Sequence, residues 1–382
     1  MDSLSLLDKL VAFPTVTRQS NLQLIDYVAQ LLAANGIRYE LVPDPTGEKA
    51  NLYARLGAAE GTGVLLSGHT DVVPVDGQNW TCPPFELTRN DSLLHGRGTA
   101  DMKGFVACAL SAFLRAASLR LSRPLHLALS YDEEIGCVGV RGLVERLKQE
   151  RDWRGWICLV GEPTGMVPAL GHKGKLALRA TCRGSEAHSA LAPLALNAIH
   201  LGCAFVDALR REQRSLAADG AQDPDYPVPY STVHAGVFSA GTELNIVPNR
   251  CTVEFEIRNV AEDDAHSILD RIRTRARRIV EDASSLSPHA AIEIEILNAY
   301  PGLRTSRASE AVRLAEELIG TKRSIKVAFG SEAGIFASEL GMDAVVCGPG
   351  SMEQGHTADE YITIEQIQRC DLMLDRLLQQ IS

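Results

Sequence analysis

Short, almost continuous apolar runs constrain the fold of this chain more than any other feature of its sequence. They occupy residues 64–67, 125–130 and 156–160, and segments with helical periodicity at 105–118 and 139–150 separate them. Strands that are apolar on both sides must be covered on both sides, which is typical of a largely parallel sheet between two layers of helices. The sequence therefore predicts an α/β fold, in which ligands bind beyond the carboxyl ends of the strands. Further helices are predicted at 4–13, 21–35, 308–319 and 364–380, and a further strand at 344–347.

The sequence pattern changes at Lys175 and changes back near residue 292. Strands with alternating apolar residues are predicted at 175–184, 230–238, 250–258 and 291–297, and amphipathic helices at 196–214 and 262–281. Two strand–helix–strand units of this kind indicate an antiparallel α+β, ferredoxin-like module. A chain of 382 residues also exceeds the size at which a single core stops growing, about 250–300 residues. We therefore expect a first domain in two parts, 1–174 and 292–382, and an inserted domain at 175–291.

The composition argues against several partners and compartments. Lys and Arg number 38 and Asp and Glu number 48, which gives a net charge of −10 and disfavours nucleic acid or an anionic membrane surface as a partner. There is no run of about 18 apolar residues to span a membrane. The N-terminal segment places Asp2 and Asp8 among helically spaced apolar residues, unlike a signal peptide. The nine cysteines are odd in number and lack C-x-x-C spacing, which is typical of buried free thiols in a cytoplasmic protein.

Two motifs near the first apolar run indicate a metal site. S-G-H-T-D-V-V-P, residues 67–74, places His69 and Asp71 on the same side of an extended chain. We expect the Asp71 carboxylate to hold the far ring nitrogen of His69, which is how a metal-bound histidine is usually oriented. G-R-G-T-A-D-M-K-G, residues 96–104, brings Asp101 from a glycine-rich turn to the start of a helix. Taken singly, the first motif also suits a surface pair, and Asp101 also suits a helix N-cap.

Three later segments supply further candidate ligands at strand ends or in loops. L-S-Y-D-E-E-I-G-C (129–137) carries Glu133 and Glu134, L-V-G-E-P-T-G (159–165) carries Glu162, and G-P-G-S-M-E-Q-G-H-T-A-D-E-Y (348–361) carries His356. Each of these side chains alone could be a solvated surface group. Together with the first two motifs they form a mixed set of imidazoles and carboxylates at successive strand ends, and such a set suits zinc.

The motifs and their order resemble the zinc-dependent aminoacylase–carboxypeptidase family, which has a paired-metal site. The resemblance runs nearly end to end, through H-T-D-V-V-P, G-R-G-T-A-D-M-K-G, S-Y-D-E-E-I-G-C, G-E-P-T, H-K-G, G-S-E-A-H-S-A, E-L-N-I-V-P-N and E-Q-G-H-T-A-D-E-Y. It implies a zinc-peptidase-like catalytic domain, with the inserted module as a lid or dimerisation domain of a homodimer. It also implies hydrolysis of the amide bond of a small N-acyl amino acid.

The resemblance implies two Zn²⁺ ions per subunit, for which Co²⁺ can substitute. Asp101 would be the carboxylate that bridges both ions. His69 and Glu162 would complete the first metal site. Glu134 and His356 would complete the second.

The resemblance also implies catalytic roles. Glu133 would be the general base that takes a proton from water and returns it to the leaving amine, and Asp71 would lie behind His69. His188, in G-S-E-A-H-S-A, would reach across the dimer and stabilise the tetrahedral oxyanion; a neighbour that caps a helix is its structural alternative. The family also tends to have a non-proline cis peptide after the bridging residue, here between Asp101 and Met102.

Three residues match family positions that contact the substrate. The guanidinium of Arg258 could bind an α-carboxylate in two places, although a surface arginine at a strand end fits the pattern equally well. Asn245 lies in E-L-N-I-V-P. Glu332 lies in F-G-S-E-A-G-I-F (329–336), which resembles the family's deacetylating members, and could meet a distal ammonium of the substrate. Members with other acyl or amino-acid preferences share most motifs. A non-catalytic metal-binding homologue is the alternative of a different class, which the complete set of ligands and base in this chain disfavours.

Overall fold

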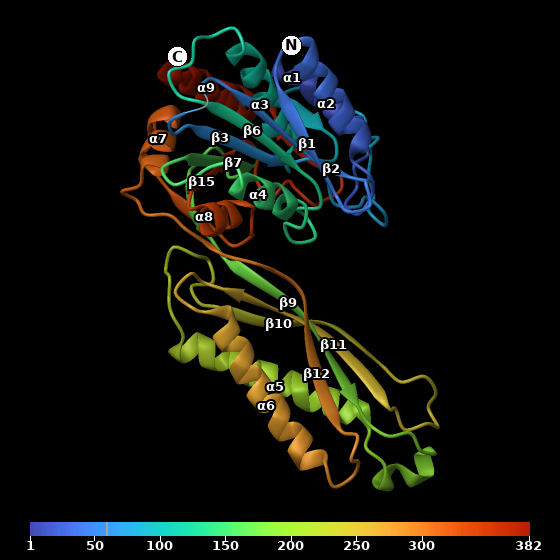
Figure 1. Ribbon diagram of the computed structural model, residues 1–382. Helices are drawn as coiled ribbons and strands as arrows, with labels where there is room; N and C mark the ends of the chain where they lie inside the picture. The colour runs from blue at the N-terminus through green and yellow to red at the C-terminus, as the bar shows by residue number, and fades with distance from the viewer. Residues whose placement is uncertain (59) are drawn as a thin grey trace. The chain divides into compact units, whose positions relative to one another are not determined.

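The protein divides into two compact units in the computed structural model, which describes residues 1–58 and 60–382 (Figure 1). The first unit contains Met1–Gly171, Leu303–Val327 and Ser331–Ser382, and the second contains His172–Gly302 and Ala328–Gly330. The second unit extends beyond the expected boundary at residue 291. The reason is that β12 (Ala291–Tyr300) pairs with β9 (Gly174–Arg183) along its length, so residues 292–302 belong to the second unit.

A mostly parallel nine-stranded sheet forms the centre of the first unit. Its strands lie in the order β1-β2-β6-β3-β7-β15-β8-β13, and β14 pairs with β8. β6, β3, β7 and β15 run parallel to one another, whereas β1 and β2 are antiparallel additions beside β6. The predicted α/β fold is confirmed. The strands are β1 (Tyr39–Pro43), β2 (Ala50–Leu56), β3 (Val64–His69), β6 (Leu125–Ser130), β7 (Ile157–Pro163), β8 (Ala169–His172), β13 (Leu303–Arg304), β14 (Ile325–Val327) and β15 (Asp343–Gly348).

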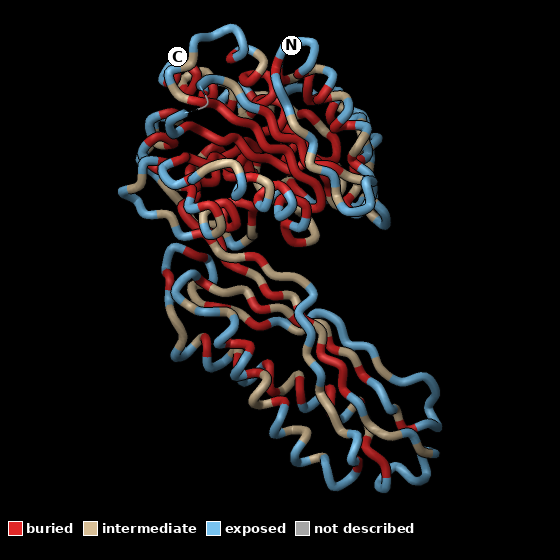
Figure 2. The backbone as a smooth tube through the Cα atoms, viewed as in Figure 1, coloured by how far each residue is buried: buried red, intermediate tan, exposed pale blue. Residues whose placement is uncertain are grey.

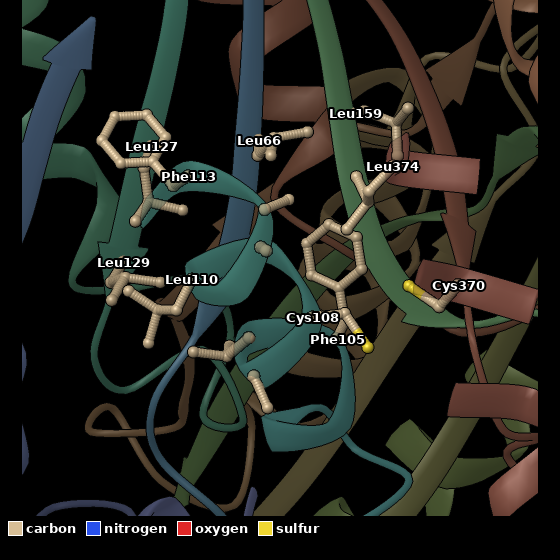
Figure 3. Close-up of a cluster of buried hydrophobic side chains, with 14 of the residues drawn as sticks. Leu66, Phe105, Cys108, Leu110, Phe113, Leu127, Leu129, Leu159, Cys370 and Leu374 are labelled. Carbon is tan, nitrogen blue, oxygen red and sulfur yellow. The ribbon is translucent and has the colours of Figure 1, made fainter. Parts of the chain in front are cut away.

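Two layers of helices cover this sheet because successive strand residues face opposite sides. Leu66 of β3 and Leu127 of β6 face α3 and α9, where Figure 3 shows them among Phe105, Phe113 and Leu374. α4 and α8 contact each other and cover the opposite side of the sheet (Figure 1). The helices of this unit are α1 (Ser3–Val11), α2 (Leu22–Ala34), α3 (Lys103–Ala116), α4 (Val140–Lys148), α7 (Glu310–Ile319), α8 (Ala333–Leu340) and α9 (Ile364–Ile381). A small sheet is formed by β4 (Thr88–Asn90), β5 (Leu93–His95) and β16 (Tyr361–Thr363).

The second unit contains a four-stranded antiparallel sheet in the order β10-β11-β9-β12. Two helices, α5 and α6, contact each other and pack on the sheet through a buried apolar cluster (Figure 2). The chain order of strand–helix–strand, repeated once, is that of the expected ferredoxin-like module. Its other elements are η1 (Ser189–Leu194), α5 (Ala198–Asp219), β10 (Thr232–Ala240), β11 (Arg250–Asn259) and α6 (Ala265–Ala283). Across both units, no helix in the described ranges is long and apolar enough to cross a membrane.

Tryptophan side chains are unevenly distributed between the units. The three tryptophans, Trp80, Trp153 and Trp156, all belong to the first unit. Trp153 and Trp156 are buried, and the ring centroid of His126 lies 4.5 Å from that of Trp156. The Tyr53 hydroxyl and His126 Nδ1 are hydrogen-bonded at 2.6 Å, and burial lowers the pKa of His126 to about 3. All nine cysteines are free thiols, as predicted.

Candidate metal centre

The candidate ligands meet at one edge of the central sheet. His69 is the last residue of β3, Glu162 lies near the end of β7, and Glu134 follows β6. Asp101 precedes α3, and His356 lies in the loop between β15 and β16. Because β3, β6 and β7 are neighbouring parallel strands, their carboxyl ends lie at the same edge. All five side chains except that of His356 are nearly inaccessible to solvent.

Asp101 lies between the two imidazoles. Its Oδ1 is 3.0 Å from His69 Nε2, and its Oδ2 is 3.1 Å from His356 Nε2. The remaining carboxylates extend this arrangement on each side, with Glu162 Oε1 at 3.9 Å from His69 Nε2 and Glu134 Oε2 at 3.1 Å from His356 Nε2. A carboxylate with one oxygen toward each histidine has the arrangement required to bridge two cations. The peptide bond between Asp101 and Met102 is cis.

The donor set fits a divalent cation. Possible ligand atoms of His69, Glu133 and Glu162 lie within 4.8 Å of one another, as do those of His69, Asp101 and Glu134. Glu162 Oε1 is buried and makes no hydrogen bond to any described residue. A buried, unpartnered carboxylate oxygen is costly unless a positive charge compensates it. Imidazole nitrogens and carboxylate oxygens together are ligands that zinc accepts.

The electrostatics of the cluster also favour a bound cation. Burial, reinforced by neighbouring carboxylates, raises the pKa of Glu133 to about 8 and that of Glu134 to about 7, and raises the pKa of Glu162 as well. Burial acts in the same direction on Asp101, but hydrogen bonds from His356 and His69 lower its pKa well below the usual value. The protein alone therefore does not keep all four carboxylates ionised at neutral pH. A divalent cation at this position would stabilise their ionised forms.

Asp71 does not hold His69 in the way we expected. The Nδ1–H of His69 donates to the main-chain carbonyl of Asp71 at 2.9 Å, whereas the nearest carboxylate oxygen of Asp71 is 3.6 Å away. The Asp71 carboxylate instead accepts from the main-chain N–H groups of Glu133 (3.0 Å) and Glu134 (3.3 Å) and from the Thr17 hydroxyl (2.9 Å). The donor at Nδ1 leaves Nε2 of His69 free to bind a metal. Asp71 therefore orients the ring through its backbone and holds the Glu133–Glu134 segment through its side chain.

Glu133 is held separately from its neighbour Glu134. Its Oε1 accepts a hydrogen bond from the buried Cys137 thiol at 3.2 Å. The preceding residue, Asp132, adopts a left-handed backbone conformation with φ of 51°. The Asp132 carboxylate accepts from the Arg18 main-chain N–H at 2.8 Å and forms an ion pair with Lys49. The turn that separates the two glutamates from β6 is thus fixed on both sides.

Comparison with known proteins identifies the family. The sequence model of the family described as "Peptidase family M20/M25/M40" matches residues 65–380 of the chain. The chain belongs to this family. It is therefore a hydrolase that acts on amides, and metal binding agrees with the ligand groups in its first unit. Among curated relatives of this M20 chain, an acetylornithine deacetylase of Myxococcus xanthus is 34% identical over 376 residues, 97% of this chain and 95% of the relative. An acetylornithine deacetylase of Pasteurella multocida (strain Pm70) is 31% identical over 387 residues, 99% of this chain and 97% of the relative.

Solved structures support the M20 fold. An M20 family metallo-carboxypeptidase, Sso-CP2 from Sulfolobus solfataricus, aligns with a TM-score of 0.79 at 21% identity and covers 99% of both chains. The Bacillus subtilis YXEP protein, described as a dinuclear metal-binding peptidase of the M20 family, aligns with a TM-score of 0.71 at 14% identity. That alignment covers 99% of this chain and 97% of the other. At these identities the similarity shows the fold alone.

Three of the other expected residues of this M20 chain, His188, Asn245 and Arg258, lie in its second unit. His188 is the N-cap of η1, and its Nδ1 accepts from the Ala190 main-chain N–H at 3.1 Å. The Ser189 N–H donates to the Asn245 carbonyl at 2.9 Å, so the His188 and Asn245 segments lie side by side. Arg258, near the end of β11, donates to Glu256 at 3.1 Å and to the Tyr300 hydroxyl at 2.7 Å. The capping role considered for His188 is therefore present, and it leaves Nε2 of the ring available.

Glu332 lies elsewhere than we expected. It is 1% exposed and directly precedes α8, beneath the ends of β3 and β6. The Ser130 hydroxyl donates to its Oε1 at 2.5 Å and the Ser67 hydroxyl donates to its Oε2 at 3.2 Å. Burial raises the pKa of Glu332 to about 7. A carboxylate enclosed by two strand hydroxyls is not placed to meet a substrate ammonium, so that prediction does not agree with the structure.

Two buried polar residues near the ligands, Arg97 and Glu360, were not assigned from the sequence. Arg97 and Glu360 form an ion pair of 2.6 Å in which each side chain is 1% exposed. Both lie inside motifs that carry a ligand, Arg97 before Asp101 and Glu360 after His356. This proximity was the only signal available in the sequence. The pairing itself could not be read from it, because the two residues are 263 positions apart.

Proposed function

We propose that the protein is a two-zinc deacetylase that converts N²-acetyl-L-ornithine and water into L-ornithine and acetate, a step of arginine biosynthesis. The observation that carries the proposal is Asp101, which has one carboxylate oxygen beside each of His69 and His356 in a buried acidic cluster. The names of the relatives that are 31–34% identical over nearly the whole chain point to the same substrate.

In this proposal two Zn²⁺ ions would be held by five residues: Asp101 would be shared, His69 and Glu162 would hold one ion, and Glu134 and His356 would hold the other. Co²⁺ would be accepted in their place. When bound, the paired ions would supply a water of lowered pKa and polarise the acetyl carbonyl. The remaining steps fall to side chains of the protein.

Glu133 is the proposed general base. Its Oε1 accepts a hydrogen bond from the Cys137 thiol. Oε2 is therefore the oxygen left to take the proton of the attacking water and return it to the leaving amine nitrogen. Burial raises the pKa of Glu133 to about 8. Bound cations would lower this pKa and favour the ionised carboxylate that can accept the proton.

The second unit would bind and orient the substrate in a cytoplasmic homodimer. The Arg258 guanidinium binds the α-carboxylate, and Asn245 contributes a polar contact. Nε2 of His188 of the partner subunit donates to the oxyanion, while Nδ1 stays engaged with the η1 turn.

The test is acetate or acyl release across a panel of N-acyl amino acids, with chelated protein reloaded with Zn²⁺ or Co²⁺. We expect N²-acetyl-L-ornithine to have the highest kcat/KM and the chelated protein to be inactive until reloaded. A preference for acetylcitrulline, for N-succinyl diaminopimelate or for apolar acetylated amino acids would reassign the substrate within the same chemistry. A protein that holds two ions but hydrolyses no member of the panel would be a non-catalytic metal-binding homologue.

A further inference from the structure

We propose that Glu360, with Arg97, is a positioning residue that sets the main-chain geometry of two candidate ligands, Asp101 and His356, at once. The inference rests on the proposed two-metal site. It concerns residues outside that ligand set and makes its own prediction about metal affinity.

Glu360 is tied to the turn that carries Asp101. Its Oε1 accepts hydrogen bonds from the main-chain N–H of Ala100 at 2.9 Å and of Asp101 at 3.1 Å. Its Oε2 accepts from Arg97 Nη1 at 2.6 Å. Both acceptor oxygens are therefore occupied inside the protein, and the side chain is 1% exposed. One carboxylate thus fixes the peptide groups on the N-terminal side of the proposed bridging residue.

Arg97 extends the same network to the loop that carries His356. Its Nη1 also approaches the Thr357 carbonyl at 3.3 Å, and its Nη2 donates to Gln78 Oε1 at 2.5 Å. Gln78 Nε2 in turn donates to the carbonyl of His356 at 2.8 Å. The guanidinium lies over the Trp80 ring, 5.0 Å from its centroid. A continuous chain of hydrogen bonds therefore links the main chain of His356 with that of Asp101.

The main chain at these positions needs external support. His356 has a left-handed conformation with φ of 61°, which a non-glycine residue adopts only when its surroundings hold it there. The imidazole is 44% exposed, so packing does not fix the ring. Its Nε2 nevertheless lies 3.1 Å from Asp101 Oδ2. Two ligands on loops far apart in sequence keep this spacing because the same buried ion pair holds both backbones.

A purely structural role predicts different results from a positioning role. Replacing one partner of a buried ion pair destabilises a protein, so a loss of activity alone would not separate them. The two roles are separated by comparing the change in zinc affinity with the change in the free energy of unfolding of the same variant. Partners that hold metal ligands typically contribute about 10–100-fold to metal affinity, whereas a salt bridge of the same unit remote from the site should contribute nothing to it.

The experiment compares Glu360→Gln and Gln78→Ala with the control Glu40→Gln in full-length, metal-free protein. The Glu40 carboxylate accepts hydrogen bonds from Nε and Nη2 of Arg146 at 2.7 and 3.0 Å, so the control also breaks a two-point ion pair in the first unit. Zinc is titrated against a competing chelator dye, unfolding is followed by circular dichroism, and the visible spectrum of the Co²⁺-loaded protein reports ligand geometry.

We expect Glu360→Gln to weaken binding of at least one ion about 10–100-fold and to change the Co²⁺ spectrum. Gln78→Ala removes the link from Arg97 to the His356 carbonyl, together with the acceptor of the Trp80 indole N–H, but leaves the hydrogen bonds of Glu360 in place. It should therefore weaken one ion more than the other. Glu40→Gln should leave zinc affinity and spectrum at parental values.

Parental affinities and spectra in a folded Glu360→Gln protein would overturn the inference. If Glu360→Gln does not fold, Gln78→Ala decides in the same way. A parent that binds no pair of ions would instead refute the proposed function.

Discussion

At the scale of single residues, the adjacent glutamates after β6 differ in their contacts. Glu134 lies beside His356, whereas Glu133 contacts the Cys137 thiol and has no imidazole within 4.0 Å among the described ion pairs. We predict that Glu133→Gln lowers kcat by at least about 10²–10⁴-fold, because the amide cannot accept the proton of water. The variant should keep the parental zinc content, measured by elemental analysis. A fast variant, or one that has lost its zinc, would show that the roles of the two glutamates are reversed.

His126 makes a residue-scale prediction about pH. Its pKa is lowered to about 3 by burial and by nearby arginines, so between about pH 3 and the unfolded value of about 6.5 the unfolded chain binds more protons. Stability therefore falls as pH falls through this window, by at most about 1.4 kcal/mol per pH unit for this one group.

The measurement is urea unfolding of metal-free parent and His126→Gln protein between pH 4 and pH 7. Gln can still form a hydrogen bond with the Tyr53 hydroxyl, but it loses the ring contacts of the imidazole with Trp153 and Trp156. We therefore expect a lower stability at pH 7, and a shallower decline toward pH 4 because Gln does not titrate. His234→Gln, which removes an exposed histidine of β10, is the control. Identical pH slopes in the parent and in His126→Gln would contradict the prediction, since the metal-site carboxylates are common to both proteins.

At the scale of elements, α3 and β7 pack so closely that only glycine fits between them. A Cβ atom at Gly161 would lie 1.9 Å from Cγ of Phe105. Gly161 precedes Glu162 on β7, and Phe105 lies in the first turn of α3, just after Asp101. The contact therefore fixes the separation of two elements that carry candidate ligands.

We predict that Gly161→Ala destabilises the protein by about 1–3 kcal/mol or more, as overpacking does, and weakens zinc binding. Gly142→Ala in α4 is the matched control, because its new Cβ would come no closer than 3.8 Å to another atom. Loss of a helix-interior glycine should stabilise that variant by about 0.5–1 kcal/mol. Unfolding and zinc titrations check both. Parental zinc affinity in Gly161→Ala would show that the separation of α3 and β7 does not control the site.

The parallel core and its ligand motifs could be predicted from the sequence because their signals are local. Apolar runs define β3, β6 and β7, and helical periodicity defines α3 and α9. α8 was not predicted because A-G-I-F-A-S-E-L is short and apolar on most sides. The group of Asp71 that accepts from His69 could not be predicted. The spacing of the two residues shows that they are close, but not whether the main-chain carbonyl or the carboxylate of Asp71 accepts the hydrogen bond. The burial of Glu332 depends on Ser67 and Ser130, which only the folded sheet brings together.

At the scale of the whole molecule, His188 tests the proposed dimer. Loss of one oxyanion donor raises the barrier by about 2.7–4 kcal/mol in comparable sites, so His188→Ala should lower kcat more than it raises KM. If the donor comes from the partner subunit, mixing inactive Glu133→Gln with inactive His188→Ala should restore activity after subunit exchange. One site of a mixed dimer then has both functional residues. Exchanged mixtures without activity, or a fully active His188→Ala protein, would leave His188 as the cap of η1 alone.

The placement of the tryptophans has an optical consequence. Because all three belong to the first unit, ultraviolet emission excited at the indole band senses that unit only, whereas the helices and strands of both units contribute to circular dichroism. Denaturation curves recorded by the two signals on one sample would superimpose if the units melt together and separate if they melt one after the other. Emission thus distinguishes loss of the metal-bearing unit from loss of the inserted one without any attached dye.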